Sequence, residues 1–194
     1  MDADRIKEIK EEVMNAVLEE FQDKGIKFTM DDIARHVGMS KKTLYEIFQD
    51  KDTLFDEMVT HTFSKIKEEE RKVLEDSSLS IVEKVCKIMI VLPGRYENLN
   101  VKQIALMEQK YPKVYRQIQK RLESDWEPTI ALLKEGMEAG EIRKISIPVL
   151  KAMIEGTISQ FFSRDVLAGE TVSYAQALDE MMDIIMRGIA AKPA

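Results

Sequence analysis

The sequence predicts an all-α protein, and three observations carry this prediction. Apolar residues recur every three or four positions along most of the 194-residue chain, which is the spacing of one helical face. Only five prolines and eight glycines occur, which favours long helices over a fold of strands and turns. No stretch alternates apolar and polar residues as a half-buried strand does. We therefore expect about nine helices and no sheet.

The N-terminal fifty residues predict three helices of unequal length. The first is amphipathic and ends near Gly25, and two short helices follow at about 29–37 and 41–48. Gly38 lies between the short helices and tolerates the left-handed conformation that a helix end requires. Two short helices joined by a glycine-containing turn form a helix-turn-helix unit, whose second helix enters the major groove of DNA.

The stretch 28–55 carries a resemblance to a known family. At fixed spacing it holds Phe28, Thr29, Ile33, Ala34, Val37, Gly38, Ser40, Thr43, Leu44, Tyr45, Phe48, Lys51, Leu54 and Phe55. This run resembles the DNA-binding domain of TetR-type (tetracycline-repressor-like) transcriptional regulators. A weaker similarity lies in Gly136-x-x-x-Gly140-x-Ile142-Arg143. The resemblance implies a helix-turn-helix DNA-binding domain at 1–50 and a helical effector-binding and dimerisation domain at 51–194.

The remainder of the chain is divided by capping and breaking residues. A helix beginning near Asp52 extends well past the helix-turn-helix, and a nearly all-apolar run after Ser80 predicts a buried helix. Tyr111-Pro112 marks a boundary, because the residue before proline disfavours helix. Pro128 lies inside a long helical pattern and either kinks that helix or splits it in two.

Seven side chains are the candidates for contact with DNA. On a helix from Lys41, each residue turns by about 100°, so Lys42 and Tyr45 lie opposite the apolar side. Lysine can donate to guanine, and hydroxyl groups suit phosphates, which position a protein without specifying sequence. These residues match DNA-contact positions of the family: Thr29, Ser40, Lys41, Lys42, Thr43, Tyr45 and Lys51.

Two positions on the same helix depart from the family pattern. Glu46 and Ile47 stand where polar or aromatic residues are usual. Glu46 would repel phosphate or accept a hydrogen bond from a cytosine amino group. From Lys24 to Lys51, six basic residues oppose four acidic ones, while the whole chain has a net charge of −6. DNA binding must therefore depend on geometry and on the doubled contacts of a dimer.

The resemblance also implies a small apolar or amphipathic effector and a homodimer. Candidate effector-binding residues are Met89, Leu92, Tyr96, Met107, Trp126, Ile130 and Phe161, although such residues at helical spacing also suit an ordinary core. Two C-terminal helices carry wide apolar stripes that either cap the core or pair with a second copy. Pairing is preferred, with the interface at Leu150, Met153, Ile154, Ile158, Phe162, Leu178, Met181, Met182 and Ile185.

Other classes of function find little support in the sequence. Two histidines and one cysteine occur, and no G-x-S-x-G, P-loop or C-x-x-C motif is present. We predict no catalytic residues, no metal and no cofactor. A helical-bundle metal-carboxylate enzyme and a helical adaptor that does not bind DNA remain as alternatives. The chain has neither the apolar core of a signal peptide nor a membrane-length apolar run, which predicts a cytoplasmic protein.

Overall fold

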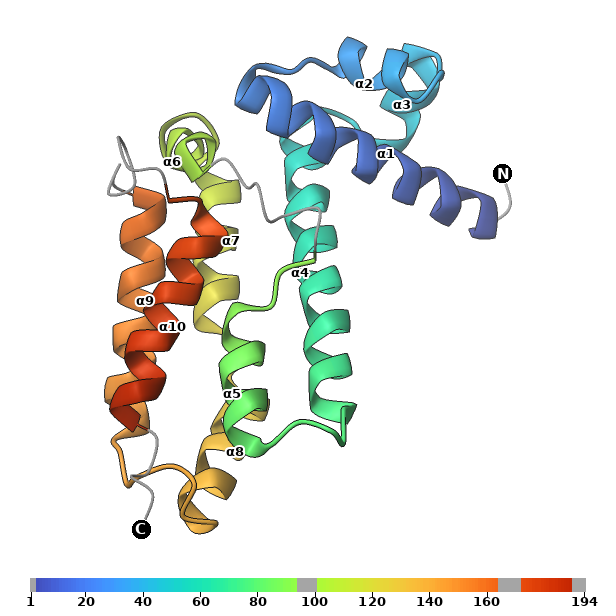
Figure 1. The fold of residues 1–194 in the computed structure, drawn as a ribbon. Coiled ribbons are helices and arrows are strands. Elements are labelled where there is room, and N and C mark those ends of the chain that lie inside the picture. The colour runs from blue at the N-terminus through green and yellow to red at the C-terminus, as the bar shows by residue number, and fades with distance from the viewer. Residues whose placement is uncertain (1–2, 94–100, 164–171, 190–194) are drawn as a thin grey trace. The chain divides into compact units, whose positions relative to one another are not determined.

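The computed structural model describes residues 3–93, 101–163 and 172–189, and it confirms the predicted all-α fold (Figure 1). All regular elements within these ranges are helices. They form two compact units, one of Met1–Phe63 with Lys102–Ile118 and the other of Ser64–Val101 with Gln119–Ala194. The functional division at residue 50 stays a prediction.

The first unit contains the predicted helix-turn-helix. Its elements are α1 (Ala3–Lys24), the 3₁₀ turn η1 (Gly25–Lys27), α2 (Met30–His36), α3 (Lys41–Ile47), the beginning of α4 (Lys51–Glu75), most of α6 (Val101–Lys110) and the beginning of α7 (Pro112–Glu123). Aromatic side chains fill its core, because Phe28, Phe48 and Phe55 are fully buried. Gly38 has a φ of +64° between α2 and α3, as the turn requires.

The second unit contains the C-terminal helices. They are α5 (Ile81–Ile90), α8 (Glu127–Glu138), α9 (Ile147–Ser163) and α10 (Tyr174–Ile189). In Figure 1, α9 (orange) and α10 (red) lie side by side, and the stacked rings of Phe162 and Tyr174 join them. Leu133, Ile142, Ile154 and Met182 are fully buried. This unit therefore has its own apolar core.

Pro128 splits the long helical pattern in two. Helix α7 ends at Glu123 and α8 begins at Glu127, with Pro128 in its first turn. Proline is tolerated there because the first N–H groups of a helix have no intrahelical partner. Asp125 in the connection has a φ of +63°. The choice between a kink and a break is thus settled as a break.

The weaker family similarity at Gly136 has a packing cause. A Cβ on Gly136 would lie 2.7 Å from the Cδ1 atom of Ile142, which is fully buried. Only glycine lets the loop after α8 fold back so closely. The amides of Glu141 and Ile142 both donate to the Gly136 carbonyl, which closes this turn.

No helix in the described part of the chain combines the length and apolarity needed to cross a membrane.

Candidate nucleic-acid interface

Helix α3 presents a polar face on a buried apolar base. Leu44 is fully buried, whereas Lys42, Tyr45 and Glu46 are exposed. Tyr45 keeps 48% of its surface accessible. The structure therefore places Lys42 and Tyr45 together on the outer face of the second short helix.

Two of the predicted phosphate contacts are helix caps. Thr29 Oγ1 accepts from the Asp32 amide at 3.2 Å, and Ser40 Oγ accepts from the Thr43 amide at 3.1 Å. The Thr29 hydroxyl also donates to Asp32 Oδ2, while Ser40 and Thr43 share a hydroxyl hydrogen bond of 2.8 Å. These three hydroxyls set the starts of α2 and α3, and phosphate contacts by them stay a prediction.

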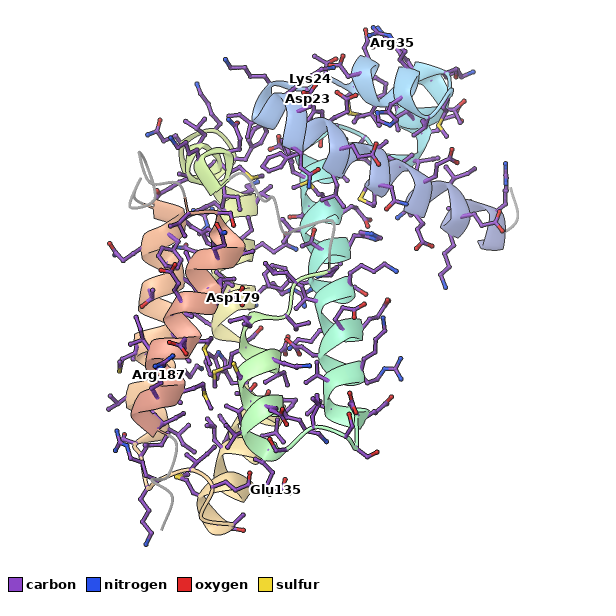
Figure 2. The ribbon with its side chains drawn as sticks, in the orientation of Figure 1. Asp23, Lys24, Arg35, Glu135, Asp179 and Arg187 are labelled. Atoms are coloured by element: carbon purple, nitrogen blue, oxygen red, sulfur yellow. The ribbon has the colours of Figure 1, made fainter. Side chains whose placement is uncertain are left out.

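The basic residues of this surface differ in whether a neighbouring carboxylate compensates their charge. The Lys41 ammonium pairs with Asp31, so its charge is partly compensated. Within the described residues, no hydrogen bond or ion pair engages Lys42 or Tyr45. Arg35 on α2 is a further candidate, because 79% of its side chain is exposed and its nearest carboxylate, on Asp32, is 3.8 Å away (Figure 2). It is not among the seven predicted residues.

Asp32 joins the cap of α2 to α1. Its carboxylate accepts from Thr29 and from Lys24 Nζ, at 2.9 Å for the latter. The hydrogen bonds from Thr29, followed by the one from Lys24, hold the pKa of Asp32 far below its usual range. The charged form of Asp32 therefore anchors the start of α2 throughout the physiological pH range.

The Lys51 side chain is turned into the protein, and a contact of Lys51 with DNA stays a prediction. Its Nζ donates to the carbonyl of Ile26 at 2.6 Å and to the carbonyl of Phe28. The ammonium lies 4.4 Å from the centre of the Phe28 ring, and burial lowers its pKa. Both directed bonds go to the backbone before α2, so the geometry assigns Lys51 an internal role. Sequence spacing could not reveal this, because it does not report which way a long side chain folds.

Replacing Lys51 with methionine should lower the free energy of unfolding by about 1–3 kcal/mol. Methionine keeps the apolar stem but leaves the carbonyls of Ile26 and Phe28 without this donor. Urea denaturation followed by circular dichroism would measure the change. Lys110→Met, at an exposed position on α6, is the matched control and should change stability little. Equal stability of the two variants would contradict the internal role.

Most residues predicted for the dimer interface lie on the faces of α9 and α10 that are buried in the protomer itself. Eight of its nine residues are not exposed, and Ile154, Leu178 and Met182 are among the most deeply buried. Only Met153 is exposed, at 55%. An apolar helical stripe shows that a face is buried, but not whether the helix's own core or a second copy covers it. The candidate contact surface must therefore be redrawn.

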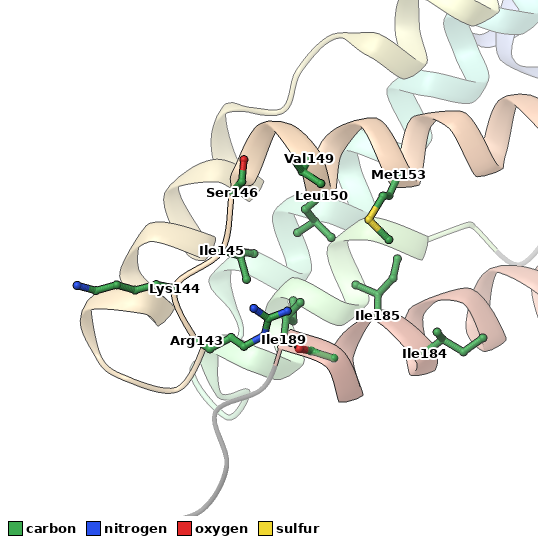
Figure 3. A pocket seen from close by; sticks show the side chains of 11 residues that line it. Arg143, Lys144, Ile145, Ser146, Val149, Leu150, Met153, Ile184, Ile185 and Ile189 are labelled. Atoms are coloured by element: carbon green, nitrogen blue, oxygen red, sulfur yellow. Dashed lines mark hydrogen bonds between the residues drawn. The ribbon is translucent and has the colours of Figure 1, made fainter.

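An apolar surface remains uncovered on the outside of these helices. Val149, Met153 and Ile184 are exposed at 58%, 55% and 73%. They line a pocket of about 410 Å³ between the start of α9 and the end of α10 (Figure 3). Gly156 and Gly188 are exposed on the same two helices, and a Cβ on either would meet nothing within 4 Å. We call these five residues the outer apolar face.

The predicted effector-binding residues are divided between the units. Met107 is fully buried in the first unit, whereas Met89, Leu92, Trp126, Ile130 and Phe161 belong to the second and are half-buried. Trp126 Nε1 donates to the Leu122 carbonyl, and the Phe161 ring meets Tyr174 edge to face. Tyr96 lies outside the described residues. None of the seven lines the pocket on the outer apolar face, so this site stays a prediction.

Within the described residues, no group of three or more histidine, cysteine, aspartate or glutamate side chains is arranged to hold a metal ion. His36 lies against Glu19 and Glu20 of α1, at 3.2 and 3.1 Å. Its ring thus serves as a bridge between α2 and α1.

Comparison with known proteins agrees with the geometry. The sequence profile of the family described as "Bacterial regulatory proteins, tetR family" matches residues 13–58. An uncharacterized HTH-type transcriptional regulator of Bacillus subtilis (strain 168), YvaF, is 29% identical over 170 residues, which are 88% of this chain and 90% of that protein.

Solved structures share the fold along nearly the whole chain. A protein from Mesorhizobium loti, assigned to the TetR family of transcriptional regulators, aligns with a TM-score of 0.67 and 20% identity over 95% of this chain and 96% of its own. The transcriptional regulator FadR of Bacillus subtilis, in complex with stearoyl-CoA, aligns with a TM-score of 0.59 and 17% identity over 92% and 98%. The matching profile over residues 13–58 and the related regulator support the resemblance of the chain to TetR-type transcriptional regulators, and the exposed second helix of the helix-turn-helix agrees with it.

Proposed function

We propose that the protein is a ligand-responsive, DNA-binding transcriptional regulator that binds a palindromic operator as a homodimer and acts as a repressor. One observation carries the DNA-binding assignment: α3 exposes Lys42 and Tyr45 on a buried base, with both short helices capped at their first turns. A helix held in this way can enter the major groove without first becoming ordered. Because such a regulator acts where the DNA is, we place it in the cytoplasm.

The outer apolar face supports the proposed homodimer. Three large apolar side chains stand exposed there beside two glycines that let another helix approach closely. A two-fold pairing would bring the same face of both copies together. The interface we propose is therefore this face, with Met153 retained from the predicted stripe.

An apolar or amphipathic effector is proposed for the second unit. The FadR structure contains stearoyl-CoA, which is such a molecule. In this chain, Met89, Leu92 and Ile130 are apolar yet only half-buried, so they are available to line a cavity. An effector releases DNA only if it binds the DNA-free state more tightly than the DNA-bound state. We propose that α4, which belongs to both units, carries this difference to the helix-turn-helix.

Lys42→Ala and Tyr45→Phe test the DNA interface. Lys42→Ala should weaken operator binding by about 1–3 kcal/mol and change the base preference, because lysine can donate to a base edge. Tyr45→Phe removes one hydroxyl and should weaken all sequences alike, by about 0.5–1.5 kcal/mol. The operator is first selected from random DNA with the wild-type protein, and affinities are measured by fluorescence anisotropy.

The matched control for charge is Lys110→Ala on α6, which should leave base preference unchanged. If neither Lys42→Ala nor Tyr45→Phe alters affinity for the selected DNA, α3 is not the helix that recognises DNA. If the wild-type protein selects no DNA at all, the alternative of a helical adaptor that does not bind DNA replaces the proposed function.

A further inference from the structure

Gln103, far along the chain, contacts the segment that leads into α2, and Tyr111 reaches the same segment through an aromatic cluster. Residues 102–118 belong to the same compact unit as the helix-turn-helix, although about fifty residues separate them from α3 in sequence. Gln103 Oε1 accepts a hydrogen bond of 3.0 Å from the Ile26 amide. Gly25 has a φ of +60° and is buried, and a Cβ there would lie 1.9 Å from Gln103 Oε1. The Gln103 amide group therefore occupies the space that the missing side chain leaves.

Tyr111 provides the second contact, through an aromatic cluster. Its ring meets Phe55 at a centroid distance of 4.6 Å, and Phe55 meets Phe28 at 5.2 Å. The Lys51 ammonium lies within 5.8 Å of all three ring centres while it donates to the Ile26 and Phe28 carbonyls. The cluster thus joins residue 111 to the backbone on the other side of Ile26.

The segment that these contacts hold, Gly25–Phe28, lies directly before the N-cap residue of α2. Thr29 begins the capping box, and α2 packs against α3. Gly25 is free of a side chain, and the segment makes a single 3₁₀ turn without a side-chain cap of its own. Besides its packing against α1, the segment is contacted by Gln103 on one side and by Lys51 on the other.

We propose that Gln103 and Tyr111 are positioning residues for DNA binding, which hold Gly25–Phe28 and thereby fix the orientation of α2 and α3. This goes beyond the proposed function, in which α3 contacts DNA and α4 carries the signal. The DNA-binding unit is incomplete without residues 102–111, so a movement of α6 alters the helix-turn-helix without passing along α4. The DNA readout below rests on the proposed function, whereas the exchange readout does not.

The experiment uses the full chain and a matched set of variants. Gln103→Met keeps the side-chain length and removes the acceptor, whereas Gln103→Glu keeps an acceptor oxygen at the same place. Tyr111→Leu removes the ring, and Tyr111→Phe keeps it. Gln109→Met is the control, because Gln109 is an exposed glutamine on the same helix. Amide hydrogen exchange of residues 25–28 is measured first, and affinity for the DNA selected by the wild-type protein second.

Gln103→Met and Tyr111→Leu should speed exchange at the Ile26 amide about tenfold or more and weaken DNA binding about three- to tenfold. Gln103→Glu, Tyr111→Phe and Gln109→Met should behave as the wild type in both measurements. A merely structural role would not give this rescue by the conservative variants in affinity.

Three outcomes overturn the proposal. One is unchanged exchange in Gln103→Met, and another is faster exchange with unchanged DNA affinity. The third is an equal loss of affinity in Gln103→Glu and Gln103→Met. If Tyr111→Leu fails to fold, the Gln103 pair still decides. Absence of DNA binding by the wild type would count against the proposed function. The exchange data would still decide whether Gln103 and Tyr111 hold the segment Gly25–Phe28 in place.

Discussion

Replacing Ile184 with glutamate is expected to convert the proposed homodimer into monomers and to weaken operator binding by about 100-fold or more. The Ile184 side chain is 73% exposed in the protomer, so the substitution should not disturb the fold of the monomer. In the proposed dimer, the new carboxylate would be buried among apolar side chains and would lie beside Asp183 of its own helix. DNA binding weakens because a monomer contacts only one half-site, so binding at one half-site no longer brings a second copy to the other. Sedimentation velocity gives the oligomeric state, and anisotropy with the selected DNA gives the affinity.

Leu106→Glu is the matched control for this experiment. Leu106 is also a large exposed apolar residue, at 42%, but it lies on α6 and outside the outer apolar face. Its substitution should leave the dimer intact. A dimeric Ile184→Glu variant would place the contact between copies elsewhere, whereas dissociation caused by both substitutions would remove the specific claim for α9 and α10.

Gly25→Ala is expected to lower the free energy of unfolding by about 2–5 kcal/mol, the largest stability effect that we predict for one methyl group. Two costs combine at this position. The φ of +60° is unfavourable for alanine, and the new Cβ would overlap Gln103 Oε1 at 1.9 Å. Guanidinium denaturation monitored by circular dichroism would measure the loss.

Gly38→Ala separates the two costs. Gly38 has nearly the same φ, +64°, but a Cβ there would meet nothing within 4 Å. It should cost only the backbone part, about 1–2 kcal/mol. The double variant Gly25→Ala/Gln103→Ala should be more stable than additivity predicts, because the smaller side chain removes the clash. Equal losses at Gly25 and Gly38 would show that Gln103 does not press on Gly25.

Local signals in the sequence predicted most of the helix boundaries. Capping boxes with reciprocal hydrogen bonds begin α2 at Thr29, α5 at Ser80 and α10 at Ser173. The break at Tyr111-Pro112 is confirmed as well, since α6 ends at Lys110 and α7 begins at Pro112. Such features are predictable because both partners lie within about three residues of each other.

The direction in which a side chain or a helix face turns was predicted less well. Lys51 matched a DNA-contact position, yet its ammonium is directed to the carbonyls of Ile26 and Phe28. The C-terminal stripe was expected at a dimer interface, yet Ile154 and Met182 are buried in the protomer. In both cases the competing partners are distant in sequence, and periodicity does not distinguish between them.

The sequence by itself determined the all-α class, the resemblance to TetR-type regulators and the position of the helix-turn-helix, because spacing, caps and glycine positions are local properties of the chain. Only the tertiary structure decided that residues 102–118 complete the DNA-binding unit and that Val149, Met153 and Ile184 remain exposed. These outcomes depend on which surfaces meet across long separations in sequence. The contact of Gln103 with Gly25, 78 residues apart, leaves no pattern in either neighbourhood.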